Sequence, residues 1–214
     1  MKIKVMLLAM ALCFSIVSVA DEPLVIHGYV LPPEPDPDVN NATLLGVDSN
    51  SNGVRDDVER WIYTRYNTYI PCVEKEVKVF IPTTGETITG YKKVCEDERK
   101  PYHQIVREIA MQGARAAQII IQEPEKARET RKYFEDAVYC GSYFKHFAEY
   151  RNEPLLLDHY IFGDEFKTIQ FNTSQRVSAF ATYNSVLSGG VYPGRSIDEK
   201  RASCMFDIDE LLKE

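Results

Sequence analysis

The segment from Asp48 to Glu59 constrains this chain most, because its oxygen-bearing side chains follow the spacing of a metal-binding loop. Acidic or amide residues stand at its first, third, fifth and ninth positions, with Gly53 at the sixth and a glutamate at the twelfth. Calcium takes roughly 6–8 oxygens at about 2.3–2.6 Å, so short side chains alternate while the backbone bends round the ion. The expected ligands of one calcium ion are the side chains of Asp48, Asn50, Asn52, Asp56 and Glu59 and the carbonyl of Val54.

A simpler interpretation is a solvated loop that leads into a helix. Asp56, Asp57 and Glu59 would lie in the first helical turn, where acidic residues are favoured by the helix dipole without any metal. That interpretation explains the acids after Gly53, but it does not explain the alternation before it.

The spacing resembles the EF-hand-like calcium loops of secreted bacterial proteins, such as dockerin modules and thrombospondin type 3 repeats. The resemblance covers about residues 47–62 and implies calcium ligation by the same six residues. The string NGVRDDVER also resembles a family of bacterial envelope proteins, which implies no activity. Two features depart from a full EF-hand, since the approach to the loop is proline-rich and Arg55 stands where an aliphatic residue usually pairs with a second loop. With no second loop in the sequence, we expect one site with a Kd of about 10⁻⁵–10⁻³ M.

Residues 1–20 have the pattern of a secretory signal peptide. Lys2 and Lys4 precede an apolar run from Val5 to Val17, and small residues at Ser18 and Ala20 precede the expected cut. The apolar run is shorter than the roughly 20 residues that a membrane-spanning helix needs, so no transmembrane segment is expected after cleavage. We therefore expect a periplasmic or secreted protein. Its net charge of −7 argues against nucleic acid or an anionic membrane as a partner.

Residues 21–47 are expected to form an extended, proline-rich arm. Leu24 to Leu31 could be one strand, and the four prolines between Pro32 and Pro37 favour a stiff spacer. A proline-rich ligand for another protein is the alternative. The helical domain is then expected over residues 48–214, beginning with the calcium loop.

The stretch from Cys72 to Cys95 is predicted to be a β-hairpin inserted into the helical domain. Apolar residues alternate on both sides of a turn at residues 82–85. If Thr83 and Thr84 form the loop, Cys72 lies directly opposite Cys95, which favours a disulfide there. Cys140 and Cys204 would form the second pair, although four cysteines allow three connectivities. The cysteine and histidine spacing does not fit a zinc site, because no CxxC occurs.

The rest of the sequence has helical periodicity, which predicts a mainly α fold, namely a small helical bundle with the inserted, disulfide-closed hairpin and the N-terminal arm. Apolar residues recur three and four apart in each segment. The helices are expected at residues 56–69, 102–121, 124–150 and from Thr173 or Ser174 to Leu187, with a short amphipathic turn at 208–212.

No catalytic motif stands out in the sequence. It lacks GxSxG, HExxH, a phosphate-binding glycine loop and a CxxC redox motif. The cluster Tyr139, Tyr143, Phe144, Phe147 and Tyr150 could be core or could line a ligand groove. We expect a structural calcium site that supports interaction with another envelope or secreted protein. A hydrolase with scattered catalytic residues, or an inhibitor or immunity-type binder that uses the hairpin, remains open.

Overall fold

The computed structural model describes residues 22–151 and 161–213, and it is mainly α-helical. Its larger helices are α2 (Asp56–Arg65), α3 (Gln104–Gln122), α4 (Ala127–Lys145) and α7 (Ser174–Leu187). The expected signal peptide and most of the stretch from Leu155 to Phe162 lie outside the described residues. In the described part of the chain, no helix is both long and apolar enough to cross a membrane.

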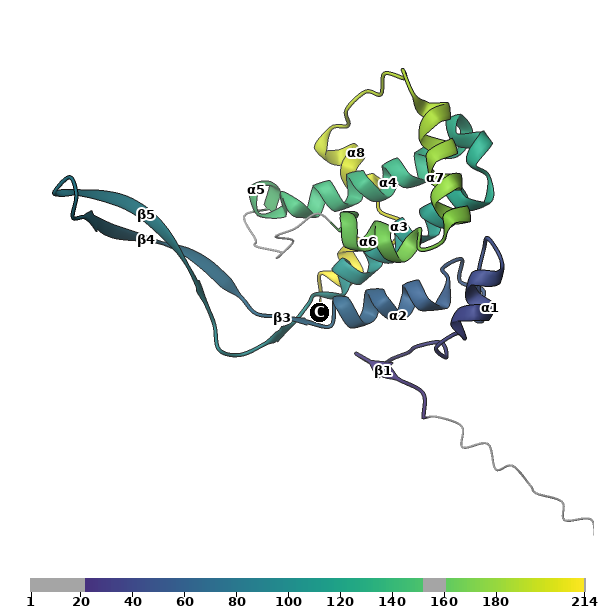
Figure 1. Cartoon of the computed structure of the whole chain (residues 1–214), viewed down its shortest axis with the longest axis horizontal. Coiled ribbons are helices and arrows are strands. Elements are labelled where there is room, and N and C mark those ends of the chain that lie inside the picture. The colour runs from purple at the N-terminus through teal and green to yellow at the C-terminus, as the bar shows by residue number, and fades with distance from the viewer. Residues whose placement is uncertain (1–21, 152–160, 214) are drawn as a thin grey trace, which may run out of the picture.

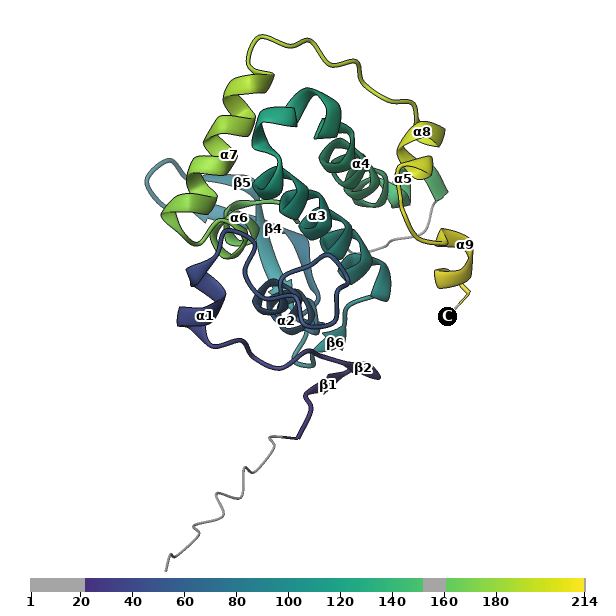
Figure 2. The same cartoon turned by 90° about the vertical axis from the view of Figure 1, so that its right-hand side faces the viewer.

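Helix α3 is the central element of the bundle. Figure 2 shows it between α2, α4 and α7, and it is buried along nearly its whole length. Gly113 is needed for this packing, because a Cβ atom there would lie only 1.9 Å from Cε1 of Phe162. The apolar stripe predicted for residues 102–121 is therefore confirmed as core, with Val106, Ile109 and Ile120 among its most buried members.

The predicted helix from Asp56 to Tyr69 ends earlier than expected. Helix α2 stops at Arg65, and strand β3 (Thr68–Tyr69) then pairs with β6 (Lys100–Pro101). The expected helix over 124–150 is likewise divided into a 3-10 turn at Pro124–Lys126, helix α4 and helix α5 (Phe147–Arg151). Of the two expected starting residues of α7, Thr173 is the cap, since its hydroxyl accepts a hydrogen bond from the backbone amide of Arg176 at 3.3 Å.

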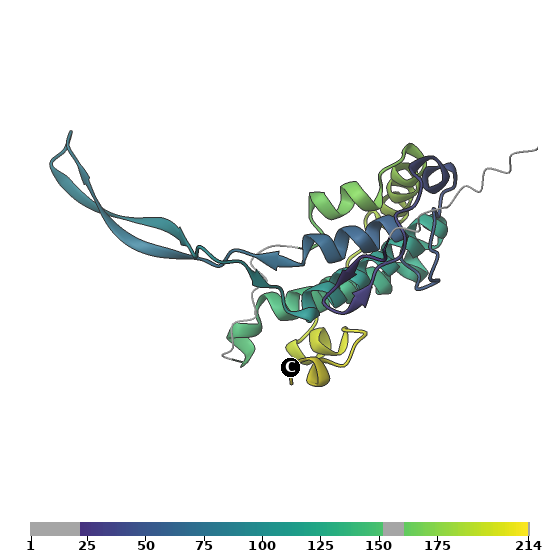
Figure 3. The same ribbon diagram turned by 90° about the horizontal axis from the view of Figure 1, so that it is seen from below.

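The hairpin and both cysteine pairs are confirmed. Strand β4 (Cys72–Ile81) pairs with β5 (Glu86–Cys95) in the register that places Cys72 opposite Cys95, and this pair forms a disulfide. Figures 1 and 3 show the hairpin extending well away from the helices. Strands β3 and β6 join its base to the end of α2 and the start of α3.

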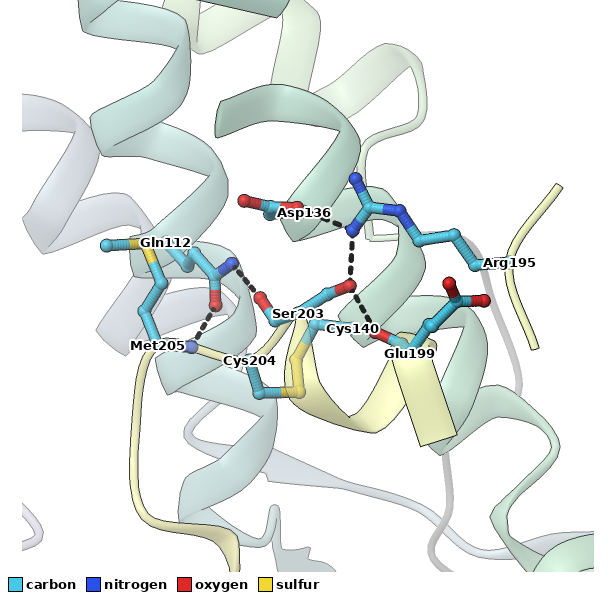
Figure 4. Close-up of a disulfide and its surroundings, with 8 residues drawn as sticks. All are labelled: Gln112, Asp136, Cys140, Arg195, Glu199, Ser203, Cys204 and Met205. Carbon is cyan, nitrogen blue, oxygen red and sulfur yellow. Dashed lines mark hydrogen bonds and ion pairs between the residues drawn. A yellow bond between two sulfur atoms is a disulfide. The ribbon is translucent and has the colours of Figure 1, made fainter. Parts of the chain in front are cut away.

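The second disulfide joins Cys140 of α4 to Cys204 in the C-terminal segment. That segment contains α8 (Ile197–Ala202) and α9 (Ile208–Leu211). Figure 4 shows how Gln112 of α3 holds the same segment, donating to the carbonyl of Ser203 at 2.8 Å and accepting from the amide of Met205 at 3.0 Å.

The prediction of an extended proline-rich arm is wrong. Strands β1 (Val25–Ile26) and β2 (Tyr29–Val30) form a short hairpin, and Pro37–Ala42 forms helix α1. Proline is well tolerated in the first helical turn, and the carboxylate of Asp36 caps the helix by accepting from two backbone amides. Pro37 thus starts a helix, and the other three prolines precede it.

Arg176 of α7 binds the arm to the helical body. Its fully buried guanidinium donates to the carbonyls of Asn40, Thr43 and Leu44 at 2.7, 3.1 and 3.0 Å. Burial, together with the neighbouring charge of Arg55, lowers the pKa of Arg176 to about 10, which leaves it charged at neutral pH. Three carbonyls without α-helical partners are satisfied by one side chain, so the arm is part of the folded domain.

Candidate metal centre

The predicted loop lies at the start of α2, between the β1–β2 hairpin and α3. Its two ends are joined by hydrogen bonds from the amide of Asp56 to the carbonyl of Val47 at 2.8 Å and from the amide of Ser49 to Oδ1 of Asp56 at 3.0 Å. Gly53 bends the chain with a φ of +82°, a backbone conformation that glycine adopts without strain.

In the first half of the loop, side-chain oxygens accept hydrogen bonds from backbone amides a few residues further along the chain. The two carboxylate oxygens of Asp48 accept from the amides of Asn52 and Gly53 at 3.1 and 2.9 Å. Oδ1 of Asn50 accepts from the amide of Asn52 at 3.2 Å, and Oδ1 of Asn52 accepts from the amide of Val54 at 2.9 Å. Such turns explain the alternation of Asp and Asn, because the oxygen of each short side chain takes the place of a backbone carbonyl in a turn. Each of these oxygens keeps a second lone pair.

Glu59 binds two side chains of the loop from the first turn of α2. Its Oε2 accepts from the amide nitrogens of Asn50 and Asn52 at 3.1 and 2.9 Å. Its Oε1 accepts from the hydroxyl of Tyr29 at 2.5 Å. The structure therefore brings the side chains of Asn50, Asn52 and Glu59 into direct contact. Asp48 is linked to them because its carboxylate and the Asn50 side chain both accept from the backbone amide of Asn52.

Burial differs between the two halves of the predicted ligand set. Asn50 is exposed and Asp48 and Asn52 are half-buried, whereas Val54, Asp56 and Glu59 are at most 1% exposed. The loop thus has an open side formed by its first half and a closed side formed by the first turn of α2.

Tyr29 is a site residue that the sequence did not indicate. It comes from the arm, and its ring stacks on Tyr63 of α2 with the centroids 4.4 Å apart. Burial, and then the hydrogen bond to Glu59, raise the pKa of Tyr29 to about 12, so its hydroxyl stays a donor at neutral pH. No local pattern could have identified it, because the contact depends on how the arm folds back on α2.

Arg55 explains the departure at the eighth loop position. Its guanidinium is buried, forms an ion pair with Asp57 at 2.5 Å and donates to the carbonyls of Ile169 and Gln170. These carbonyls lie at the end of α6 (Asp164–Gln170), where a cation is favoured by the helix dipole. The position that pairs two loops in an EF-hand is used here to join the loop to another helix.

The charge on Glu59 has no ionic partner within residues 22–151 and 161–213. Its three hydrogen-bond donors are all neutral. Arg115 of α3 contacts the loop elsewhere, because its Nε donates to the carbonyl of Asn52 at 3.2 Å. A fully buried carboxylate without a countercharge is costly, and a bound cation would remove that cost.

The carboxylates themselves do not form a metal cluster. Nowhere in the described part of the chain do three or more His, Cys, Asp or Glu side chains come together as a metal-binding group. Half of the predicted ligand set consists of amide and backbone oxygens, and Asn50 and Asn52 turn their nitrogens toward Glu59. Calcium binding would require Glu59 to exchange these two N–H donors for the ion. Calcium ligation stays a prediction.

The pockets among the described residues do not indicate a particular reaction or ligand. One of about 320 Å³ lies between α4, α6 and α7, is lined mainly by aromatic rings, and contains Arg131 and Glu135, which pair with each other at 2.6 Å. Of the aromatic cluster on α4 and α5, Tyr143, Phe144 and Phe147 are buried core residues. Tyr139 instead donates to the carbonyl of Pro193 at 3.2 Å near the surface.

Comparison with protein-family models, with curated proteins and with solved structures gave no match to this chain. Its function is therefore inferred from the geometry of the loop and the hairpin.

Proposed function

We propose that the chain is an exported calcium-binding protein in which one ion braces the helical domain. The ligands are Asp48, Asn50, Asn52, the Val54 carbonyl, Asp56 and Glu59. The brace supports an exposed surface that binds another envelope or secreted protein.

The observation that carries this proposal is the state of Glu59. It is completely buried, it is held only by neutral donors, and the two amides on it belong to predicted ligands. A divalent cation at this point would supply the missing positive charge. The oxygens of Asp48, Asn50 and Asn52 each keep a lone pair for it.

The role of the ion follows from where α2 begins and ends. Its first turn contains Asp56 and Glu59, and its last residue, Arg65, leads through β3 into the projecting hairpin. An ion held between the loop and this first turn would restrain the helix that supports the hairpin. Tyr29 extends the restraint to the arm.

Two disulfides support an oxidising compartment, where calcium is also abundant. Calcium at about 1 mM would largely saturate a site with a Kd of 10⁻⁵–10⁻⁴ M, within the roughly 10⁻⁵–10⁻³ M range expected for such modules.

Isothermal titration calorimetry on the purified protein tests the proposal. We expect one calcium per chain and a rise in Tm with calcium that follows RT ln(1 + [Ca]/Kd). Glu59→Gln keeps the shape of the side chain and removes its charge, so it should abolish both the binding heat and the rise in Tm.

Glu125→Gln is the matched control, because it removes one negative charge from an exposed residue away from the loop. It should bind calcium like the unmodified chain. If Glu59→Gln and Asp48→Asn both retain the calcium-dependent rise in Tm, the ion binds elsewhere and the proposal is wrong.

A further inference from the structure

The projecting hairpin has two free edges. Within residues 22–151 and 161–213, β4 and β5 pair only with each other. A two-stranded ribbon is marginally stable by itself, and an unpaired edge is a template for a further strand. The length of the ribbon and its distance from the helices, seen in Figures 1 and 3, leave both edges accessible.

One face of the hairpin carries most of its aliphatic side chains and is uncovered. Residues directly opposite one another in the register share a face, and alternate residues of a strand point the same way. This rule places six aliphatic side chains on one face: Val73, Val77, Val79, Ile81, Ile88 and Val94. Three charged residues, Lys75, Glu86 and Lys92, share that face. Val73, Val79 and Ile88 are 57%, 45% and 46% exposed.

We propose that β4 is the dimerisation edge of this protein. A second copy of the chain adds its own β4 antiparallel to the first, with Val77 opposite Val77 of the second copy. The product is a four-stranded sheet in the order β5–β4–β4–β5, with the aliphatic side chains of both copies on one face. The strand that binds the free β4 edge is thus β4 of the second copy.

The charges of β4 are complementary to themselves in this register. Glu76 lies opposite Lys78 of the second copy, and by symmetry the ion pair forms twice. Val73 lies opposite Ile81 of the second copy, also twice, and no two like charges face each other. Opposite charges and aliphatic pairs directly across two strands are stabilising.

Neighbouring registers are worse. A centre at Glu76 places this residue opposite itself, and a centre at Lys78 places two lysines together. A register shifted by one residue from any of these sets the aliphatic face of one copy beside the polar face of the other, because a slip of one residue exchanges the faces of a strand. Val77 is the centre that avoids both faults.

The β5 edge is the poorer template. Gly90 lies in the middle of β5 and weakens that strand, since it contributes no side chain to the sheet. On β5, the register that pairs Glu86 with Lys92 of the second copy sets Lys93 opposite Gly85 in the turn. Both strands have ten residues, and only β4 has no glycine.

The geometry of the hairpin also leaves room for the second copy. In the register centred on Val77, Cys72 at the base of each hairpin lies opposite Pro82 in the turn of the other. The two helical domains are then separated by the length of the ribbon, roughly 34 Å at about 3.4 Å per residue.

Sedimentation equilibrium with charge-reversed variants tests this proposal. Glu76→Lys places two lysine pairs across the edge, and Lys78→Glu places two glutamate pairs there. Each variant should dimerise at least about tenfold more weakly than the unmodified chain. An equimolar mixture of the two should form a heterodimer, because both like-charge pairs become ion pairs. Recovery in the mixture shows that each variant is folded.

Lys92→Glu is the control, since it makes the same charge change as Lys78→Glu but on β5, opposite Lys75, so that no like charges face each other there in the variant. It should dimerise like the unmodified chain. An unmodified chain that stays monomeric up to about 1 mM protein overturns the proposal, as does failure of the mixed variants to associate. Measurement with calcium and with a chelator separates this outcome from the calcium site, which Glu59→Gln tests independently.

Discussion

The hydroxyl of Tyr29 donates to the carboxylate of Glu59 at 2.5 Å, across 30 positions of sequence. This contact joins the N-terminal arm to the last residue of the calcium-type loop and to the first turn of α2. The same carboxylate holds Asn50 and Asn52, so the loop, the helix and the arm meet at one buried charge.

Tyr29→Phe should weaken both the fold and the ion site. It removes one hydrogen bond to a charged group, which contributes about 1–2 kcal/mol to the free energy of unfolding. Loss of a group that orients a metal ligand commonly lowers metal affinity by about tenfold or more. Urea denaturation and calorimetry measure the two effects. Unchanged calcium affinity would mean that Tyr29 does not orient Glu59 in the bound state.

Stability should fall at alkaline pH. Burial raises the pKa values of Tyr29, Tyr66 and Tyr183 to about 12, from 10.0 in the unfolded chain. Because the folded-state pKa values are raised, the stabilisation is fully present below pH 10 and is lost as the pH rises from 10 to 12. Unfolding free energies measured across this window should decline, and Tyr29→Phe should make the decline shallower. A slope identical to that of the unmodified chain would contradict the assignment for Tyr29.

Arg176→Met should release the arm. It leaves the carbonyls of Asn40, Thr43 and Leu44 without their donor and costs at least about 3 kcal/mol. Hydrogen exchange should show faster exchange in residues 37–47. Arg128→Met, at an exposed position of α4, is the control and should change little. An arm that stays protected in Arg176→Met would show that other contacts hold it.

The two disulfides should differ in their effect on global stability. Replacing Cys140 and Cys204 by serine opens a separation of 64 residues within the core and should lower the unfolding free energy by about 4 kcal/mol. Replacing Cys72 and Cys95 frees only the base of a hairpin that lies outside the core. Thermal unfolding should register the first change strongly and the second weakly, with the hairpin losing hydrogen-exchange protection. Equal losses would mean that the hairpin is part of the cooperative core.

Local features of the fold could be predicted from the sequence, whereas contacts distant in sequence could not. The register of Cys72 with Cys95 follows from strand alternation and turn length, and the cap at Thr173 follows from local chemistry. The prediction for the arm was wrong because four prolines suggested an extended spacer, whereas Pro37 occupies the first turn of α1. Tyr29 and Arg176 act on residues 30 and more than 130 positions away, and no periodic pattern encodes such pairings.

The loop shows the same division. A bend in the loop was expected from spacing alone, whereas the hydrogen bonds from backbone amides to Asp48 and Asn52 were not predicted. The burial of Glu59 depends on packing against the arm, which spacing does not reveal.

A crystal structure grown with calcium tests the central claim most directly. The account predicts an ion between Asp48 and Glu59, with oxygen ligands at about 2.3–2.6 Å and with the amide nitrogens of Asn50 and Asn52 turned away from Glu59. Electron density that shows both amides still donating to Glu59, with only water in the loop, would contradict it.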